Sequence, residues 1–224
     1  MVGAVLTGHL LRMVRGDGRY ARVAPWYDLL SAEPVYRTGR RAAIEQLALE
    51  PGDQVLDLGC GTGLNFASIS DAIGPGGRIV GVDASPHMLA QARRRADERG
   101  WRNVNLFRAD ATSLDRREVS RAFTEGRADA VLATYALSLM PDWRGAWEAA
   151  RDLARPGARL AVVDMRLPTG RARWLTPLAR LACALGGSDP SAEPWTAVET
   201  DCRDVFAAGV RGGHVQVRVG TRRG

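Results

Sequence analysis

The residues of this chain best suited to bind a ligand lie in the stretch 57–63, where Asp57 is followed by glycines at alternate positions, Gly59, Gly61 and Gly63. Glycine weakens both strands and helices, so a glycine cluster after an aliphatic run indicates backbone that must come close to a ligand. The dinucleotide fingerprint is G-x-G-x-x-G, and here the third glycine comes one residue early. A carboxylate within the motif disfavours a pyrophosphate and favours a ligand with a cationic amino group.

Strand-like and helix-like segments alternate from residue 54 onward. The expected strands cover 54–58, 77–84, 103–110, 128–137 and 158–166, and the expected helices cover 64–74, 86–100, 115–125 and 142–154. Ser85 is expected to cap the second helix, with Pro86 at its first position. The alternation predicts an α/β fold, a doubly wound and mainly parallel sheet of about seven strands with helices on both faces. Ligands bind such a sheet at the carboxyl ends of its strands, where the glycine stretch lies.

Two regions fall outside this alternation. Residues 1–50 are expected to form an N-terminal helical lid on a main domain, 51–224, that carries a helical insert at about 167–205. Four apolar residues of the insert share one helical face: Trp174, Leu178, Leu181 and Leu185. Arginines lie beside this face. Such a helix either caps an active site or lies on a membrane surface, and we favour the cap. The tail 213–221 alternates valines and is expected to be an edge strand.

Four stretches, in order along the chain, resemble class I S-adenosylmethionine-dependent methyltransferases: "VLDLGCGTGLN", "GVDASPHML", "FRADAT" and "LARPGARLAVVD". The resemblance covers roughly residues 50–166 and implies a Rossmann-like fold with S-adenosylmethionine as cofactor and S-adenosylhomocysteine as product. It assigns to the cofactor the residues Asp57, Gly59, Cys60, Gly61, Thr62, Gly63, Asp83, Ala84, Met88, Asp110 and Ala111. S-adenosylmethionine carries an amino group and no phosphate, which suits a motif containing a carboxylate.

Within that assignment, the resemblance implies that Asp83 binds both ribose hydroxyls. It also implies that Asp110 accepts a hydrogen bond from the adenine amino group and that the Ala111 backbone N–H donates one to the adenine. Both aspartates could instead simply cap the helices that follow them. Met88 either lies against the adenine or packs in the core, and Cys60 is expected to be a small filler between glycines.

The segment "YARVAPWYDLLSAEPVYRTGRR", residues 20–41, resembles the start of the menaquinone/ubiquinone methyltransferase-like group and of bacterial phospholipid N-methyltransferases. In such enzymes it forms a lid with tyrosines over the reacting centre, so Tyr27 is a catalytic candidate. Tyr36 and Arg40 are candidates for the cofactor, the arginine near its carboxylate. At the end of the fourth strand, Tyr135 is the second catalytic candidate. Packing or a surface position is the alternative for each of them.

Charge and composition limit the classes of partner that the protein can bind. The net charge is +6, but the basic residues are all arginine and are scattered, which indicates a compositional bias rather than a nucleic-acid surface. Amino-group base methylases carry an Asn/Asp-Pro-Pro-aromatic motif where this chain has Thr134-Tyr135-Ala136. The three cysteines lack metal-ligand spacing and no carboxylates cluster, so no catalytic metal is expected.

The resulting hypothesis is methyl transfer to a small-molecule acceptor at nitrogen or oxygen. The alternatives are a phospholipid head-group N-methyltransferase at the membrane surface, and a methyltransferase-fold protein that binds the cofactor for another reaction. No apolar run reaches the ~18 residues of a membrane span, so we expect a cytoplasmic protein, monomer or homodimer, with no nucleic-acid partner.

Overall fold

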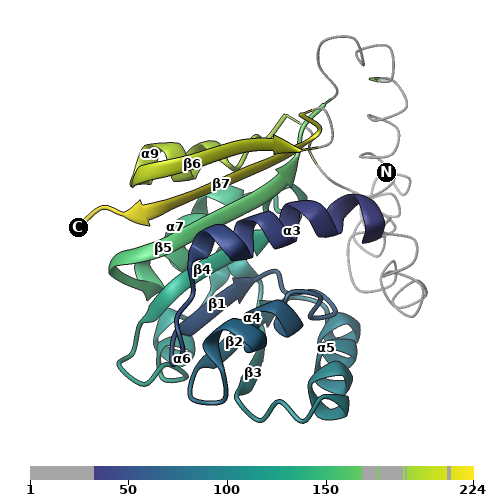
Figure 1. Ribbon diagram of the computed structural model, residues 1–224, viewed down its shortest axis with the longest axis vertical. Helices are drawn as coiled ribbons and strands as arrows, with labels where there is room; N and C mark the ends of the chain where they lie inside the picture. The colour runs from purple at the N-terminus through teal and green to yellow at the C-terminus, as the bar shows by residue number, and fades with distance from the viewer. Residues whose placement is uncertain (1–32, 168–175, 177–188, 190, 211–212) are drawn as a thin grey trace, which may run out of the picture.

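The computed structural model describes residues 33–167, 176, 189, 191–210 and 213–224 (Figure 1). Seven strands form one sheet: β1 (Gln54–Leu58), β2 (Arg78–Asp83), β3 (Val104–Arg108), β4 (Ala128–Thr134), β5 (Ala154–Met165), β6 (Cys202–Val210) and β7 (Val215–Arg222). Their order is β3-β2-β1-β4-β5-β7-β6. The first five strands run parallel, and β7 pairs antiparallel with both β5 and β6. The predicted doubly wound, mainly parallel sheet is confirmed.

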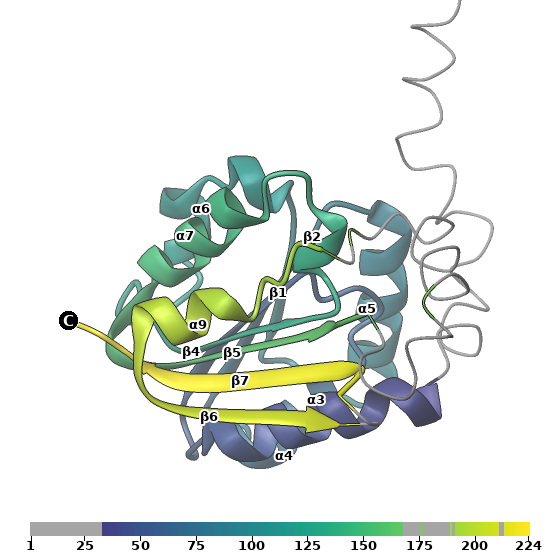
Figure 2. The ribbon, with the colours of Figure 1, turned by 90° about the horizontal axis from the view of Figure 1, so that it is seen from above.

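The helices cover both faces of this sheet (Figure 2). They are α3 (Glu33–Leu47), α4 (Phe66–Ile73), α5 (Pro86–Glu98), α6 (Arg116–Ser120), α7 (Trp143–Leu153) and α9 (Thr196–Asp201), with short 3-10 turns η1 (Ala111–Ser113) and η2 (Leu137–Leu139). α3, α4 and α5 lie on one side, and α6, α7 and α9 on the other. No helix among the described residues has the length and apolar character needed to cross a bilayer.

Alternation along the strands creates a separate apolar core on each face. Leu56 and Leu58 of β1 pack with Trp143 and Trp147 of α7, while Val55 of the same strand packs on the other side with α3 and α4. Successive strand residues point to opposite faces, so a continuous aliphatic strand fills both cores. Asp57, between the two leucines, therefore shares the side of Val55 that α3 and α4 cover.

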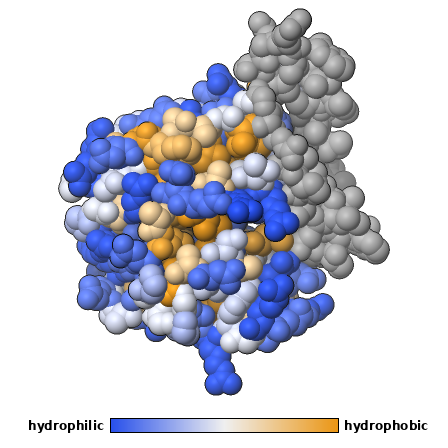
Figure 3. Space-filling model, viewed as in Figure 1, coloured by the Kyte–Doolittle hydropathy of each residue, from blue (hydrophilic) through white to orange (hydrophobic). Residues whose placement is uncertain are grey.

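Helix α3 is amphipathic and crosses the sheet over β4, β5 and β7. The side of α3 that faces the sheet carries the buried residues Ala43, Ile44 and Leu47. Its opposite side carries the exposed residues Arg37 and Arg41. Its outer side forms part of a hydrophilic band with apolar surface above and below (Figure 3). Packing of the apolar side holds α3 against this face of the sheet.

The prediction for the last strand is wrong. The tail is not an edge strand, because β7 lies between β5 and β6, and β6 forms the edge. Val215, Val217 and Val219 are fully buried, so their alternation indicated one buried face and not a position in the sheet.

Other boundaries also differ. β6 was not predicted, and it begins at residue 202, inside the range expected for the helical insert. β4 ends at Thr134 rather than at 137, and β5 begins at Ala154 rather than at 158. The apolar helical face expected at 174–185 lies outside the described residues.

Gly81 in β2 shows how closely this core is packed. A Cβ there would lie 2.9 Å from both Cys60 Sγ and Leu106 Cδ2. We expect Gly81→Ala to lower the free energy of unfolding by about 1–3 kcal/mol, because inserted atoms force neighbours aside. Urea unfolding measures this, with Gly76→Ala as the control, since a Cβ at Gly76 meets nothing within 4 Å. Equal stability of the two variants would show that β2 yields at no cost.

Candidate functional site

The loop after β1 has the conformation that its glycines permit. Gly59, Gly61 and Gly63 have φ of 68°, 55° and 77°, in the left-handed region that other residues avoid. A Cβ on Gly59 would clash with Ala136, whereas one on Gly61 would meet nothing within 4 Å. Gly59 is therefore needed for close approach to the β4 loop, and Gly61 leaves an open surface at the centre of the site.

Asp57 is a fully buried carboxylate beneath this loop. Asn65 Nδ2 donates to both of its oxygens at 3.1 Å and to Thr134 Oγ1 at 3.0 Å. Burial raises the pKa of Asp57 to about 7, with a smaller rise from the charge of Asp83 and opposing effects of the Asn65 bond and Arg40. The Asn65 Oδ1 atom is buried without a hydrogen-bond partner among the described residues. A carboxylate and an amide oxygen here are acceptors that suit a ligand bearing N–H groups.

Asp83 connects the end of β2 to the glycine loop. Its Oδ2 accepts the Gly61 N–H at 2.9 Å, and its Oδ1 accepts the Ser85 N–H at 2.8 Å. Burial raises the pKa of Asp83, and these two bonds act in the opposite direction. Each carboxylate oxygen has a second acceptor position, which a pair of ligand hydroxyls could use.

Helix α3 brings three of the predicted residues together at the end of β4. The Tyr135 hydroxyl donates to the Tyr36 carbonyl oxygen at 2.9 Å, and the two rings lie 4.8 Å apart. The Arg40 guanidinium, 8% exposed, lies 6.0 Å from the Tyr135 ring centre. Tyr135 has φ of 55°, and a Cβ on Gly39 would clash with its hydroxyl, so α3 approaches this tyrosine closely. Tyr27 lies outside the described residues.

The other predicted cofactor residues surround this centre. Cys60, Thr62, Met88 and Ala111 are buried, while Ala84 is exposed. Burial is the main cause that raises the pKa of the Cys60 thiol, which fits its expected role as a neutral filler.

Asp110 is exposed at the end of β3. Its Oδ1 accepts from both the N–H and the hydroxyl of Thr112, at 2.9 and 2.8 Å. It therefore caps η1, as the alternative reading allowed, and capping does not occupy every acceptor position of the carboxylate.

A second buried carboxylate, Asp164 at the end of β5, was given no role from the sequence. Its Oδ1 accepts from Ser138 Oγ at 2.7 Å and its Oδ2 from the Ser138 N–H at 3.0 Å. The available signal was its position: like Asp57 and Asp83, it lies in or at the carboxyl end of a parallel strand. Its partner is 26 residues away in the chain, so spacing could not reveal the pair.

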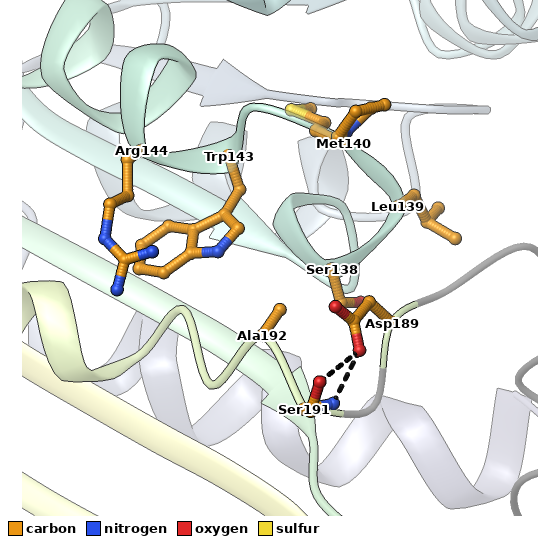
Figure 4. A pocket seen from close by; sticks show the side chains of 9 residues that line it. Ser138, Leu139, Met140, Trp143, Arg144, Asp189, Ser191 and Ala192 are labelled. Atoms are coloured by element: carbon orange, nitrogen blue, oxygen red, sulfur yellow. Dashed lines mark hydrogen bonds between the residues drawn. The ribbon is translucent and has the colours of Figure 1, made fainter.

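Ser138 lines a pocket of about 420 Å³ between the η2 turn, the start of α7 and the residues Asp189, Ser191 and Ala192 (Figure 4). Its lining residues are Ser138, Leu139, Met140, Pro141, Trp143, Arg144, Asp189, Ser191 and Ala192. The Arg144 guanidinium lies 4.3 Å from the Trp143 ring centre, and Asp189 accepts from Ser191 on the opposite wall (Figure 4). The surface of the pocket is mainly polar, with groups of both charges beside the side chains of Leu139, Met140 and Trp143. Its volume lies within the size range of small-molecule sites.

The strand order, the left-handed glycine loop and the acidic strand ends define an α/β protein of the Rossmann-like class whose loop suits a cationic ligand rather than a pyrophosphate. A family model described as a methyltransferase domain matches residues 56–160. A 2-phytyl-1,4-naphtoquinone methyltransferase from Synechococcus elongatus is 30% identical over 177 residues, which are 73% of each chain. The chain belongs to the class I S-adenosylmethionine-dependent methyltransferases.

The expected relation to the menaquinone-type group is also confirmed. A demethylmenaquinone methyltransferase from Thermus thermophilus is 35% identical over 153 residues, 66% of this chain and 65% of the relative. The fold resembles the crystal structure of an S-adenosylmethionine-dependent methyltransferase from Aquifex aeolicus, with a TM-score of 0.61, 16% identity, and coverage of 86% of this chain and 93% of the other. The chain spans 56–65% of the length of several curated relatives.

The site has the features that S-adenosylmethionine, the cofactor of this family, requires. The surface over Gly61 is open, and Asn65 Oδ1 is a buried acceptor without a partner among the described residues. Asp57 and Arg40 lie close enough for their charges to interact, which gives the site one anionic and one cationic group for the amino and carboxylate groups of a methionine. The residues present therefore fit the cofactor.

The raised pKa of Asp57 predicts proton release on cofactor binding. A cationic amino group beside Asp57 favours its ionised form, so binding near pH 6.5 should release a proton, and affinity should fall as the pH drops below about 7. Titration calorimetry with S-adenosylhomocysteine in two buffers of different ionisation enthalpy measures the release. Asp57→Asn corrects for protons lost by the ligand itself. Identical proton release by wild type and variant would contradict the prediction.

Asp83→Ala removes the carboxylate that faces the glycine loop. We expect cofactor affinity to fall by about 1–3 kcal/mol, because hydrogen bonds to a charged group are lost. Calorimetry measures this, and Asp97→Ala on the exposed side of α5 is the matched control. Unchanged affinity of the Asp83 variant would remove Asp83 from the cofactor site.

Proposed function

We propose that the protein transfers the methyl group of S-adenosylmethionine to an oxygen atom of a small organic acceptor, which binds in the pocket beside η2. The observation that supports this is the wall shared by the pocket and the cofactor loop. Met140 lines the pocket, and its Cε lies 3.6 Å from the position that a Cβ on Gly59 would take. An acceptor in the pocket would thus lie next to the loop that holds the methyl donor.

In this proposal the chain's own residues bind and orient the two substrates. Asp83 accepts hydrogen bonds from the ribose hydroxyls, and Asp110 accepts one from the adenine amino group. Arg40 pairs with the carboxylate of the methionine part. Asp57 and Asn65 face the amino group of the methionine part of the cofactor. When bound, the cofactor supplies an activated methyl group, so the protein mainly has to align the acceptor, and alignment alone is worth about 7–11 kcal/mol.

Tyr135 and Tyr27 remain the proposed residues over the reacting centre. The hydrogen bond from Tyr135 to the α3 backbone, together with its contact to the Tyr36 ring, holds the side chain between α3 and the end of β4. Its role would then be to shape the site rather than to exchange a proton. Tyr27 is assigned from the resemblance alone.

The pocket favours a conjugated acceptor that carries a hydroxyl group. Trp143, Leu139 and Met140 offer apolar contacts, and the Arg144 guanidinium lies over the Trp143 ring as a cation that a second aromatic ring could also contact. The two curated relatives described above are named for a naphthoquinone and for demethylmenaquinone, which supports a conjugated ring acceptor.

The first experiment is calorimetry of the purified full chain with S-adenosylmethionine and with S-adenosylhomocysteine, and we expect micromolar binding of both. A panel of naphthols, hydroxynaphthoquinones, small amines and phosphatidylethanolamine vesicles is then incubated with S-adenosylmethionine, and products are identified by mass spectrometry. O-methylated aromatic products would support the proposal. Methylated lipid or amine products would replace it with an N-methyltransferase. Cofactor binding without any methylated product would favour the third hypothesis, a different reaction.

A further inference from the structure

We propose that Ser138 and Asp164 form the proton-accepting pair of this enzyme. Ser138 contacts the acceptor hydroxyl, and Asp164 receives its proton through Ser138. The inference rests on the proposed function, because it needs an acceptor in the pocket. It adds a base to a site in which no histidine or metal cluster was found among the described residues of the pocket.

The hydrogen bonds place Ser138 between the pocket and the buried carboxylate. Ser138 is 4% exposed and lines the pocket, and its hydroxyl donates to Asp164 Oδ1 at 2.7 Å. A hydroxyl that donates its proton still has lone pairs to accept one. An acceptor O–H bound at Ser138 would therefore complete a chain of two hydrogen bonds that ends at Asp164, which is itself fully buried.

The surroundings of Asp164 make it a better base than an ordinary aspartate. Burial raises its pKa to about 6, while the bonds from Ser138 and the Met165 N–H act in the opposite direction. At neutral pH the carboxylate is ionised and still has more affinity for a proton than an exposed aspartate would.

Charged groups of the neighbouring elements are engaged with other partners. Arg166, just after the end of β5, pairs with Glu193, and its carbonyl bonds to His214 Nδ1. Arg218 on β7 pairs with Glu199. Opposite Asp164 on β7 stands Gln216, a neutral residue that donates to Gly213. Arg144 and Asp189 are the charged residues of the pocket lining.

A purely structural role explains this arrangement less well. Among the described residues, Asp142 and Asp83 accept from backbone N–H groups alone, and Asp110, which also accepts from the Thr112 hydroxyl, does not line the pocket. Asp164 makes such bonds too, but it also binds a side-chain hydroxyl that faces a pocket. The same pocket contains a second serine–aspartate pair, Ser191 and Asp189, in which the aspartate is exposed and its hydrogen bonds to Ser191 lower its pKa. Of the two pairs, only that of Asp164 has a raised proton affinity.

The proposed step balances as follows. The acceptor hydroxyl gives its proton to Ser138 Oγ while Ser138 gives its own proton to Asp164 Oδ1. The acceptor oxygen forms a bond to the methyl carbon, and the sulfur that loses the methyl group keeps the bonding electron pair and becomes neutral. Asp164 ends protonated and returns its proton to water after the products leave.

A titration without turnover tests the chain of hydrogen bonds. The full protein, saturated with S-adenosylhomocysteine and labelled with ¹³C at aspartate carboxyls, is titrated by NMR with and without 4-nitrophenol as probe. Asp164→Asn identifies the signal. We expect the probe to shift the pKa of Asp164 in wild type, because the two ionisations are coupled, and to leave it unchanged in Ser138→Ala. That variant keeps the Ser138 N–H bond to Asp164, so its fold should persist.

The outcomes separate this inference from the proposed function. Failure of S-adenosylhomocysteine to bind would overturn the function itself. If the cofactor product binds, then absence of probe binding, an unshifted Asp164, or a shift that persists in Ser138→Ala would each overturn the proton-accepting pair.

Kinetics with an acceptor that the panel identifies provides the second measurement. Wild-type kcat should fall as the pH drops through about 6, because Asp164 becomes protonated. Ser138→Ala should lower kcat at neutral pH by on the order of 10²-fold and lose this dependence, with partial rescue by Ser138→Thr. Ser191→Ala should change at most the KM for the acceptor, and its kcat should still fall at acid pH (the acid limb of the pH profile). An acid limb that survives in Ser138→Ala would contradict the inference.

Discussion

The hydrogen bonds that join the glycine loop to the end of β2 determine the geometry of the whole site. The N–H groups of Gly59 and Cys60 donate to the Val82 carbonyl at 2.8 and 3.0 Å, and that of Gly61 donates to Asp83. Gly59 and Gly61 make these bonds in left-handed conformations, which residues with a side chain rarely adopt. The loop is thus held open above Asp57 and close to the β4 loop, which in turn forms one wall of the pocket.

Three aspartates at the ends of parallel strands have different surroundings because their hydrogen-bond partners differ. Asp57 accepts from the Asn65 amide and interacts with the positive charge of Arg40. Asp83 accepts from backbone N–H groups, and Asp164 accepts from a serine hydroxyl. Burial raises the pKa of all three. We therefore propose that one feature of the fold, a carboxylate at the ligand-binding edge of the sheet, serves as a charge partner at Asp57, a hydroxyl-binding group at Asp83 and a base at Asp164.

The sequence predicted the parts of the fold that local patterns encode. Continuous aliphatic runs indicated the central strands, and the Ser85-Pro86 pair indicated the start of α5, where Ser85 accepts from the Met88 N–H. β6 gave no such signal: its residues are mostly exposed or half-buried, and a bulge interrupts its register between Arg203 and Phe206. The pairing of Ser138 with Asp164 and the contact of Tyr135 with α3 depend on strand order and helix packing, which periodicity does not contain.

The raised pKa values also show that the site opposes stability. An aspartate whose pKa is about 6 or 7 in the folded protein, against an ordinary value of 3.8, binds a proton more tightly when folded. Between these values the folded state holds more protons than the unfolded state, so these two groups make folding less favourable as the pH rises through that window. Above pH 7 both are buried and charged, with Asn65 and Ser138 as their main compensation. Neutral residues of the same size would avoid this cost. The retained carboxylates are consistent with a site in which one group must meet a cation and the other must accept a proton.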